Sequence, residues 1–135
     1  MRIFAIIDES LSADKVLAYL IYYERSKYSY IEISDDADSW ETPLLLSSFV
    51  DKREFSVGSY FSHLWVQQRI VPPDRQNLGR ILKENGLEEY DDFSLLLLGE
   101  GRCAQDDCYL EEIKSDELPE LLKIRWKARS KMSFL

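Results

Sequence analysis

The alternation of apolar and polar positions in the first third of the chain predicts neighbouring β-strands. Residues 2–7 are β-branched and aromatic and end at an acidic turn, a pattern typical of a strand. The apolar run 16–23 fits either a buried strand or a helix, and we favour a strand because residues 24–27 have the composition of a hairpin turn. Residues 28–33 then alternate large apolar and polar side chains, as expected of a half-buried return strand.

The middle of the chain predicts one more extended segment and a long helix. Residues 43–49 have the composition of a buried strand that opens at Pro43. The helix follows, with Ser56 and Ser59 as candidate N-caps because their hydroxyls can accept from the first free backbone N–H groups. It ends at the Pro72-Pro73 pair, since proline cannot donate a helical hydrogen bond.

Two shorter helices are predicted after the proline pair. Asp74 is the expected cap of the first, which ends at Asn85-Gly86 because glycine adopts the left-handed conformation without steric cost. Asp91 or Asp92 caps the second, which closes at Gly99.

The end of the chain predicts a last strand and a last helix. Residues 108–113 form the strand, and residues 115–135 form a basic C-terminal helix that packs on the domain or extends from it. We therefore expect a single domain over residues 1–135. Its fold class is α+β, with a small antiparallel or mixed sheet packed with about four short helices, because strands and helices are segregated along the chain.

Composition limits the classes of function. The formal net charge of −8 disfavours direct binding to nucleic acid, because phosphate binding depends on lysine and arginine. No run of about 18 apolar residues predicts a membrane span. Asp8 and Glu9 interrupt the N-terminal apolar stretch too early for a signal peptide. We expect a cytoplasmic protein with reduced thiols.

The charge is unevenly distributed along the chain. Residues 1–117 carry 12 lysines and arginines against 24 acids, whereas residues 118–135 carry five bases against one acid. Such a basic segment either folds against its own acidic domain or docks a partner.

The residues that could perform chemistry lack the partners that they would need. Cys103 and Cys108 have no second cysteine pair to complete a zinc site, and His63 is the one histidine of the chain. No serine or cysteine is placed to form a triad with His63. The glycines around Glu100 do not continue into a phosphate-binding loop. The sequence therefore predicts no enzymatic activity, no metal and no cofactor.

Several features of the middle block resemble a known family in their order and spacing. An extended segment opens with Pro-Leu at residues 43–48, and a helix ends in Ile70-Val71-Pro72. Later the chain reads Asp-Phe-Ser-Leu-Leu at residues 92–96, followed by Gly99 and Cys103-Ala104. In these features the chain resembles the N-terminal subdomain of HipA-family toxin kinases.

The chain departs from the family pattern at two places. The family has Phe-Phe-Asp-Asn before the aliphatic pair, where this chain has Val-Gln-Gln-Arg at residues 66–69. The Gly-Ala that follows the family's Cys-Ala is replaced by Gln105-Asp106.

The resemblance implies a regulatory role, because no kinase portion follows the subdomain in this sequence. It implies a free-standing subunit similar to HipS of split three-gene toxin–antitoxin modules. Such a subunit would bind and restrain a separate HipA/HipT-like Ser/Thr kinase encoded nearby, and through that complex would meet a HipB-like DNA-binding antitoxin. The alternative is a self-associating accessory protein with no kinase partner.

We expect the partner-binding residues to include large aromatic side chains, because tryptophan and tyrosine dominate interface hot spots. Two placements of Trp65 stay open, in an interface or in the core, since large aromatics also fill cores. The expected partner-binding residues are Tyr60, Trp65, Gln68, Arg69 and Trp126.

Overall fold

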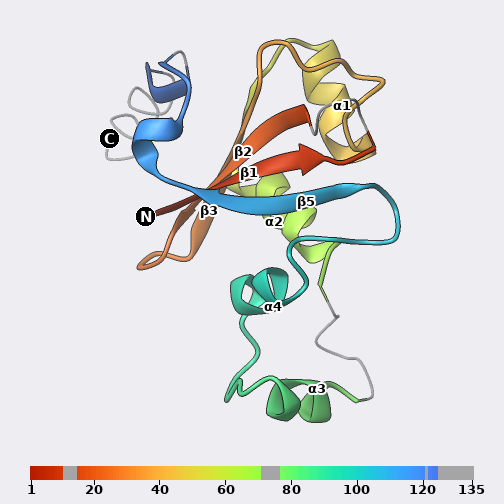
Figure 1. The fold of residues 1–135 in the computed structure, drawn as a ribbon, viewed down its shortest axis with the longest axis vertical. Coiled ribbons are helices and arrows are strands. Elements are labelled where there is room, and N and C mark those ends of the chain that lie inside the picture. Colours follow the sequence, from red (N-terminus) through yellow and green to blue (C-terminus); the bar gives the residue numbers. More distant parts are fainter. Residues whose placement is uncertain (11–14, 71–76, 121, 125–135) are drawn as a thin grey trace.

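A five-stranded antiparallel sheet in the order β4-β3-β2-β1-β5 forms the centre of the fold (Figure 1). The structure is a computed structural model and describes residues 1–10, 15–70, 77–120 and 122–124. The strands are β1 (Arg2–Asp8), β2 (Lys15–Tyr23), β3 (Tyr28–Ile33), β4 (Ser56–Val57) and β5 (Cys108–Ile113).

The first three strands confirm the elements predicted from the N-terminal apolar pattern. β1 and β2 pair along their whole lengths, from Arg2 opposite Tyr22 to Asp8 opposite Lys15. The ambiguous run 16–23 is a strand, and its hairpin to β3 turns at Lys27 with a φ of 60°. The strand predicted over residues 108–113 is also present as β5, which pairs with β1 at an edge of the sheet.

Three helices cover one face of the sheet, and a fourth lies apart from it. α1 (Leu44–Asp51), α2 (Ser59–Gln67) and α4 (Asp92–Leu98) contribute to the main core, whereas α3 (Leu78–Glu84) has no buried residue. Figure 1 shows α3 at the opposite end of the molecule from the sheet. The helical contribution to this core comes from Leu46, Trp65, Val66, Phe93 and Leu96.

The other face of the sheet has a smaller apolar cluster. Among the described residues, Leu118 and Leu122 from beyond β5 pack against it and are each 2% exposed. A short 3₁₀ turn, η1 (Ser115–Glu117), precedes them, and residues 120 and 122–124 are helical. The predicted helix 115–135 is thus present in part, and the rest of it lies outside the described residues. The strand residues of this cluster are Ile3, Ala5, Ile7, Tyr19 and Ile21.

The strand predicted over residues 43–49 is wrong, because this segment forms α1. The carbonyl of Pro43 accepts hydrogen bonds from the N–H groups of Leu46 and Ser47 at 2.9 and 3.0 Å, which begins a helix. The side chains that meet the core are Leu45, Leu46, Phe49 and Val50, a helical spacing of four residues.

The predicted caps of the long helix are also wrong. Gly58 is the residue that precedes α2, and no side chain caps this end. Ser56 lies in β4 instead, where its hydroxyl donates to Oε2 of Glu32 at 2.7 Å. Ser59 is the first residue of the helix. The end predicted at the proline pair 72–73 lies outside the described residues.

The predictions for the two shorter helices are confirmed where the structure describes them. Gly86 follows the end of α3 with a φ of 70°. Asp91 is the cap of α4, and its Oδ2 accepts from the N–H of Ser94 at 3.0 Å. Gly99 ends α4. Asp74, the expected cap of α3, lies outside the described residues. Within the part of the chain that is described, no helix has the length and apolarity needed to cross a membrane.

We predict that Gly101→Ala destabilises the fold. The added Cβ would lie 2.5 Å from Cγ of Leu110, and the backbone at Gly101 has a φ of +72°. We expect the free energy of unfolding to fall by about 2–3 kcal/mol, because both the contact and the left-handed backbone disfavour a side chain. Urea denaturation measures the change.

Gly79→Ala is the matched control. A Cβ at Gly79 meets nothing within 4 Å, and this glycine lies inside α3. We expect a gain of about 0.5–1 kcal/mol from the better helix propensity of alanine. Equal effects of the two substitutions would contradict the packing of Gly101 against Leu110.

Candidate functional site

Two of the predicted partner-binding residues lie in the interior of the protein. Trp65 is 0% exposed and belongs to the main core. Of the two placements left open for Trp65, interface and core, the structure shows the core. Arg69 is 8% exposed. The reason is that the buried face of α2 is formed by Ser62, Trp65 and Val66, and Arg69 continues it. Neither side chain is a surface anchor in this structure.

Arg69 is held by a buried set of contacts instead. Its Nη1 donates to the carbonyl of Gly101 and to Oδ1 of Asp106, each at 3.0 Å, and its Nη2 donates to Oδ2 of Asp106. The guanidinium also lies over the ring of Trp65, 4.0 Å from the ring centroid. This bidentate pair, combined with a cation–π contact, ties α2 to the turn before β5.

Asp106 also affects the pKa of the nearby Cys108. Burial raises the pKa of the Cys108 thiol to about 12, and the carboxylate of Asp106 adds to the shift. Cys108 is therefore a thiol at neutral pH and is poorly suited to act as a nucleophile or metal ligand. Among the described residues, no group of three or more histidine, cysteine, aspartate or glutamate side chains could hold a metal ion.

Of the other three predicted partner-binding residues, two are exposed and one lies outside the described residues. Tyr60 is 70% exposed near the start of α2, and its ring contacts that of Phe61, with centroids 5.1 Å apart. Gln68 is exposed and lines a cleft of about 560 Å³ beside α1. Trp126 lies outside the described residues. The proposed binding roles of Tyr60, Gln68 and Trp126 stay predictions.

Among the described residues, the two large apolar side chains with the highest exposed fraction lie around the beginning of α1. Trp40 is 93% exposed and Leu44 is 90% exposed, and Leu44 also lines the cleft that Gln68 borders. Sequence reasoning missed both positions, because Leu44 was assigned to a buried strand and Trp40 stands in an acidic loop without apolar periodicity. We call this region the α1 surface, and it consists of Trp40, Pro43, Leu44, Leu45, Ser48, Gln68 and Gln105.

The turn that carries Trp40 is well hydrogen-bonded. The N–H of Trp40 donates to Oδ1 of Asp38 at 3.0 Å. The N–H groups of Glu41 and Thr42 donate to the carbonyl of Asp38 at 2.9 and 3.1 Å. These hydrogen bonds fix the backbone at Trp40, so less backbone entropy is lost when the residue meets another molecule.

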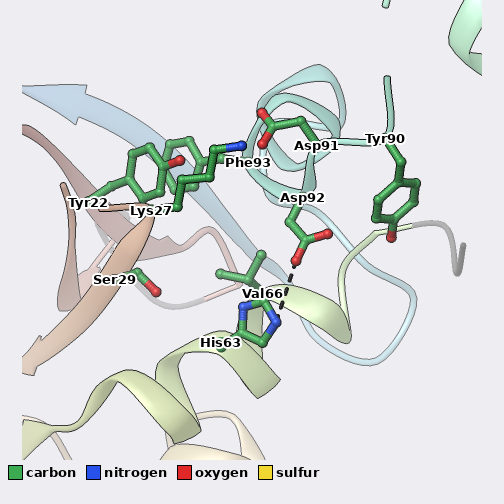
Figure 2. A pocket seen from close by; sticks show the side chains of 9 residues that line it. All are labelled: Tyr22, Lys27, Ser29, His63, Val66, Tyr90, Asp91, Asp92 and Phe93. Carbon is green, nitrogen blue, oxygen red and sulfur yellow. Dashed lines mark ion pairs between the residues drawn. The ribbon is translucent and has the colours of Figure 1, made fainter. Parts of the chain in front are cut away.

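A second cleft lies between the β2–β3 hairpin, α2 and the start of α4 (Figure 2). It has a volume of about 270 Å³ and contains the ion pair of His63 Nε2 with Asp92 Oδ2 at 3.5 Å. An adjoining cleft shares Lys27, Ser29 and His63 with it and extends to Tyr60. We call the first of these the hairpin cleft, and it is lined by Tyr22, Lys27, Ser29, His63, Val66, Tyr90, Asp91, Asp92 and Phe93.

The hairpin cleft has an acid–base pair without a nucleophile beside it. The hydroxyl of Ser29, the serine of the lining, hydrogen-bonds to the hydroxyl of Ser62 at 2.8 Å. His63 is paired with the carboxylate of Asp92. The geometry here suits binding better than covalent catalysis.

Neither the known protein families, nor the curated proteins, nor the solved structures include a match to this chain.

We predict that Trp65→Ala behaves as a core substitution. Removal of a fully buried indole should lower the free energy of unfolding by about 3–5 kcal/mol, through lost burial and the cavity left behind. Tyr60→Ala, a change at an exposed ring of the same helix, should alter stability by less than about 1 kcal/mol. Equal stability of the Trp65 variant and the wild type in urea denaturation would contradict the buried placement.

We predict that Asp106→Asn destabilises the fold by leaving Arg69 without its carboxylate. The expected loss is about 2–4 kcal/mol, below the range for a fully buried pair because the Asp106 side chain keeps 19% exposure. Glu9→Gln breaks the exposed Arg102–Glu9 pair and should cost far less, because solvent screens an exposed ion pair. Equal losses in the two variants would contradict the special role of the Arg69 pair.

The stabilisation by Asp106 has a defined pH dependence. Burial alone would raise the pKa of Asp106, but hydrogen bonds from Arg69 and from the N–H of Cys108 outweigh it and hold the pKa below 3.8. Because the folded pKa is the lower one, the stabilisation is complete above the unfolded pKa of about 4 and is lost as the pH falls through the folded pKa. The stability difference between wild type and Asp106→Asn should therefore narrow below about pH 4.

Proposed function

We propose that this protein is a non-enzymatic regulatory subunit that binds a separate Ser/Thr kinase and restrains it. The partner class follows from the resemblance to HipS, so the kinase would be HipA/HipT-like and encoded nearby. A HipB-like DNA-binding antitoxin would be met only through that complex, since the net charge of −8 opposes direct binding to nucleic acid. The complex would form in the cytoplasm.

The α1 surface is the observation that supports a binding role. Two large apolar side chains, Trp40 and Leu44, are 93% and 90% exposed. Leu44 lines a cleft of about 560 Å³, which offers a recess for a side chain of another protein, and Trp40 stands shortly before Leu44 in the chain. Exposed apolar groups around a recess are typical of interaction sites, and tryptophan is among the residues that contribute most to interface affinity.

Tyr60 and its neighbour Phe61 extend the exposed aromatic surface over the start of α2. They are 70% and 41% exposed. The ring of Phe61 also contacts that of Phe49 in α1, with centroids 5.3 Å apart, so this aromatic group adjoins α1. A partner that contacts both helices would bury a larger area than the α1 surface provides alone.

Self-association is the second candidate function, because the same exposed side chains would serve a second copy of this chain. In a two-fold dimer the same surface is used by both subunits. The protein would then be an accessory protein without a kinase partner.

We predict that Trp40→Ala/Leu44→Ala weakens partner binding without unfolding the protein. Tagged wild-type protein, expressed in its own host, should recover a HipA-like kinase that lacks this subdomain, identified by mass spectrometry. The double variant should recover at least about tenfold less, because hot-spot truncations cost more than 1 kcal/mol each.

Leu98→Ala is the matched control for this experiment. Leu98 is a helical leucine that is 50% exposed, but it lies on α4 away from the α1 surface. It should recover the kinase as the wild type does. Recovery of the tagged protein alone would overturn the kinase proposal, and equal recovery by the double variant would overturn the role of the α1 surface.

A further inference from the structure

The segment between α4 and β5 runs back alongside β5 in the antiparallel direction (Figure 1). The N–H of Leu110 donates to the carbonyl of Glu100 at 2.8 Å, and the backbone of Gly101 lies against the side chain of Leu110. One residue further along, the guanidinium of Arg102 lies over the ring of Tyr109, 4.8 Å from its centroid. These contacts place residue 101 opposite residue 110 and residue 102 opposite residue 109.

The next step of this pairing brings Cys103 opposite Cys108. Residues that face each other in an antiparallel pair have their Cα atoms about 4.5–5.5 Å apart. A disulfide needs a Cα separation of about 4.4–6.8 Å, so a facing pair of cysteines meets this requirement. Both cysteines are free thiols in this structure.

A single carboxylate in the intervening turn contacts both thiols. Burial raises the pKa of Asp106, but hydrogen bonds from Arg69, from the N–H of Cys108 and from the thiol of Cys103 lower it overall. Burial raises the pKa of the Cys108 thiol to about 12, with a smaller contribution from its hydrogen bond to the same carboxylate. Two thiols that contact one small group lie on the same side of the turn, as a bridge between them requires.

The two thiols differ in their access to solvent. Cys108 is 1% exposed, whereas Cys103 is partly exposed. A dissolved oxidant therefore meets Cys103 first, and Cys108 is placed to be the resolving thiol, which attacks the oxidised sulfur of its neighbour.

We propose that Cys103 and Cys108 form a redox modification site, at which hydrogen peroxide converts the two thiols into an intramolecular disulfide. The thiolate of Cys103 attacks one oxygen of the peroxide, and the O–O bond breaks to give a sulfenic acid and a hydroxide that takes up the proton of Cys103. The sulfur of Cys108 then attacks the sulfur of the sulfenic acid, and the S–O bond breaks. The departing hydroxide takes up the proton of Cys108, so that two thiols have lost two electrons and the peroxide has become two waters.

The position of the pair makes the second step and its consequence specific. The small thiolate fraction of Cys108 slows its attack, but the fixed neighbourhood of the two sulfurs offsets this by raising their effective concentration. Gln105 and Asp106 lie between the cysteines and line the cleft of the α1 surface, so the bridge would restrict the turn that forms one wall of this cleft. In a reducing compartment such a bridge is transient, because thiol exchange returns it to the two thiols.

Peroxide treatment of the full-length protein, reduced beforehand and freed of reductant, tests the proposal. The number of thiols that react with a maleimide in denaturant should fall from two to none. The intact chain should lose the mass of two hydrogen atoms, and dithiothreitol should restore both thiols. Thiols that stay reactive, a gain of oxygen without the loss of hydrogen, or a bridge between two chains would overturn the proposal.

Two variants assign the roles of the cysteines. Cys108→Ala should stop at the sulfenic acid, which dimedone should trap on Cys103 in at least about tenfold greater yield than in the wild type. Cys103→Ala changes the partly exposed position and should leave Cys108 unoxidised, which keeps the assignment testable whatever Cys108→Ala does to the fold. Equal dimedone labelling of wild type and Cys108→Ala, or oxidation of Cys108 in Cys103→Ala, would contradict these roles.

Discussion

The contact of Arg69 with Asp106 fixes how α2 is attached to the sheet. Oδ1 of Asp106 accepts from Nη1 of Arg69 and also from the N–H of Cys108, each at 3.0 Å, so one carboxylate joins the end of α2 to the first residue of β5. The guanidinium also donates to the carbonyl of Gly101, whose backbone lies against Leu110 of β5. A buried charge that depends on one partner makes this joint specific, because removal of either member leaves the other uncompensated.

Two clefts adjoin elements that this joint holds. Asp106 itself lines the cleft beside α1, while Val66 and His63 of α2 line the hairpin cleft on the other side. The ring of Trp65, beneath the guanidinium, connects these helices through the main core. The same interior therefore positions both the α1 surface and the hairpin cleft.

Strands β1, β2, β3 and β5 and the fold class could be predicted from sequence, because period-two alternation and turn residues are local signals. The two-residue strand β4 was not predicted, since Ser56 was assigned to the start of a helix. The helix at residues 43–49 could not be predicted, because a short apolar run fits a strand or a helix equally well. The core contacts of Leu46 and Val50, four residues apart, depend on the sheet against which they pack, and the local sequence does not show them.

The candidate site was harder to predict than the fold for a similar reason. Trp65 and Arg69 carry the residue types of a binding surface, but their face of α2 turns toward the core, where Asp106 neutralises the arginine. Asp106 is 37 residues away in sequence, and no local pattern connects the two. The exposure of Trp40 depends in the same way on the tertiary path of the turn before α1.

The central claim is that a surface at the beginning of α1, held on this scaffold, is where the protein meets its partner. Hydrogen–deuterium exchange of the protein, alone and in the assembly isolated from its own host, tests this claim most directly. The account predicts slower exchange over residues 40–48 in the assembly and unchanged exchange over α3 (Leu78–Glu84). Identical exchange over residues 40–48 in the two samples would contradict it.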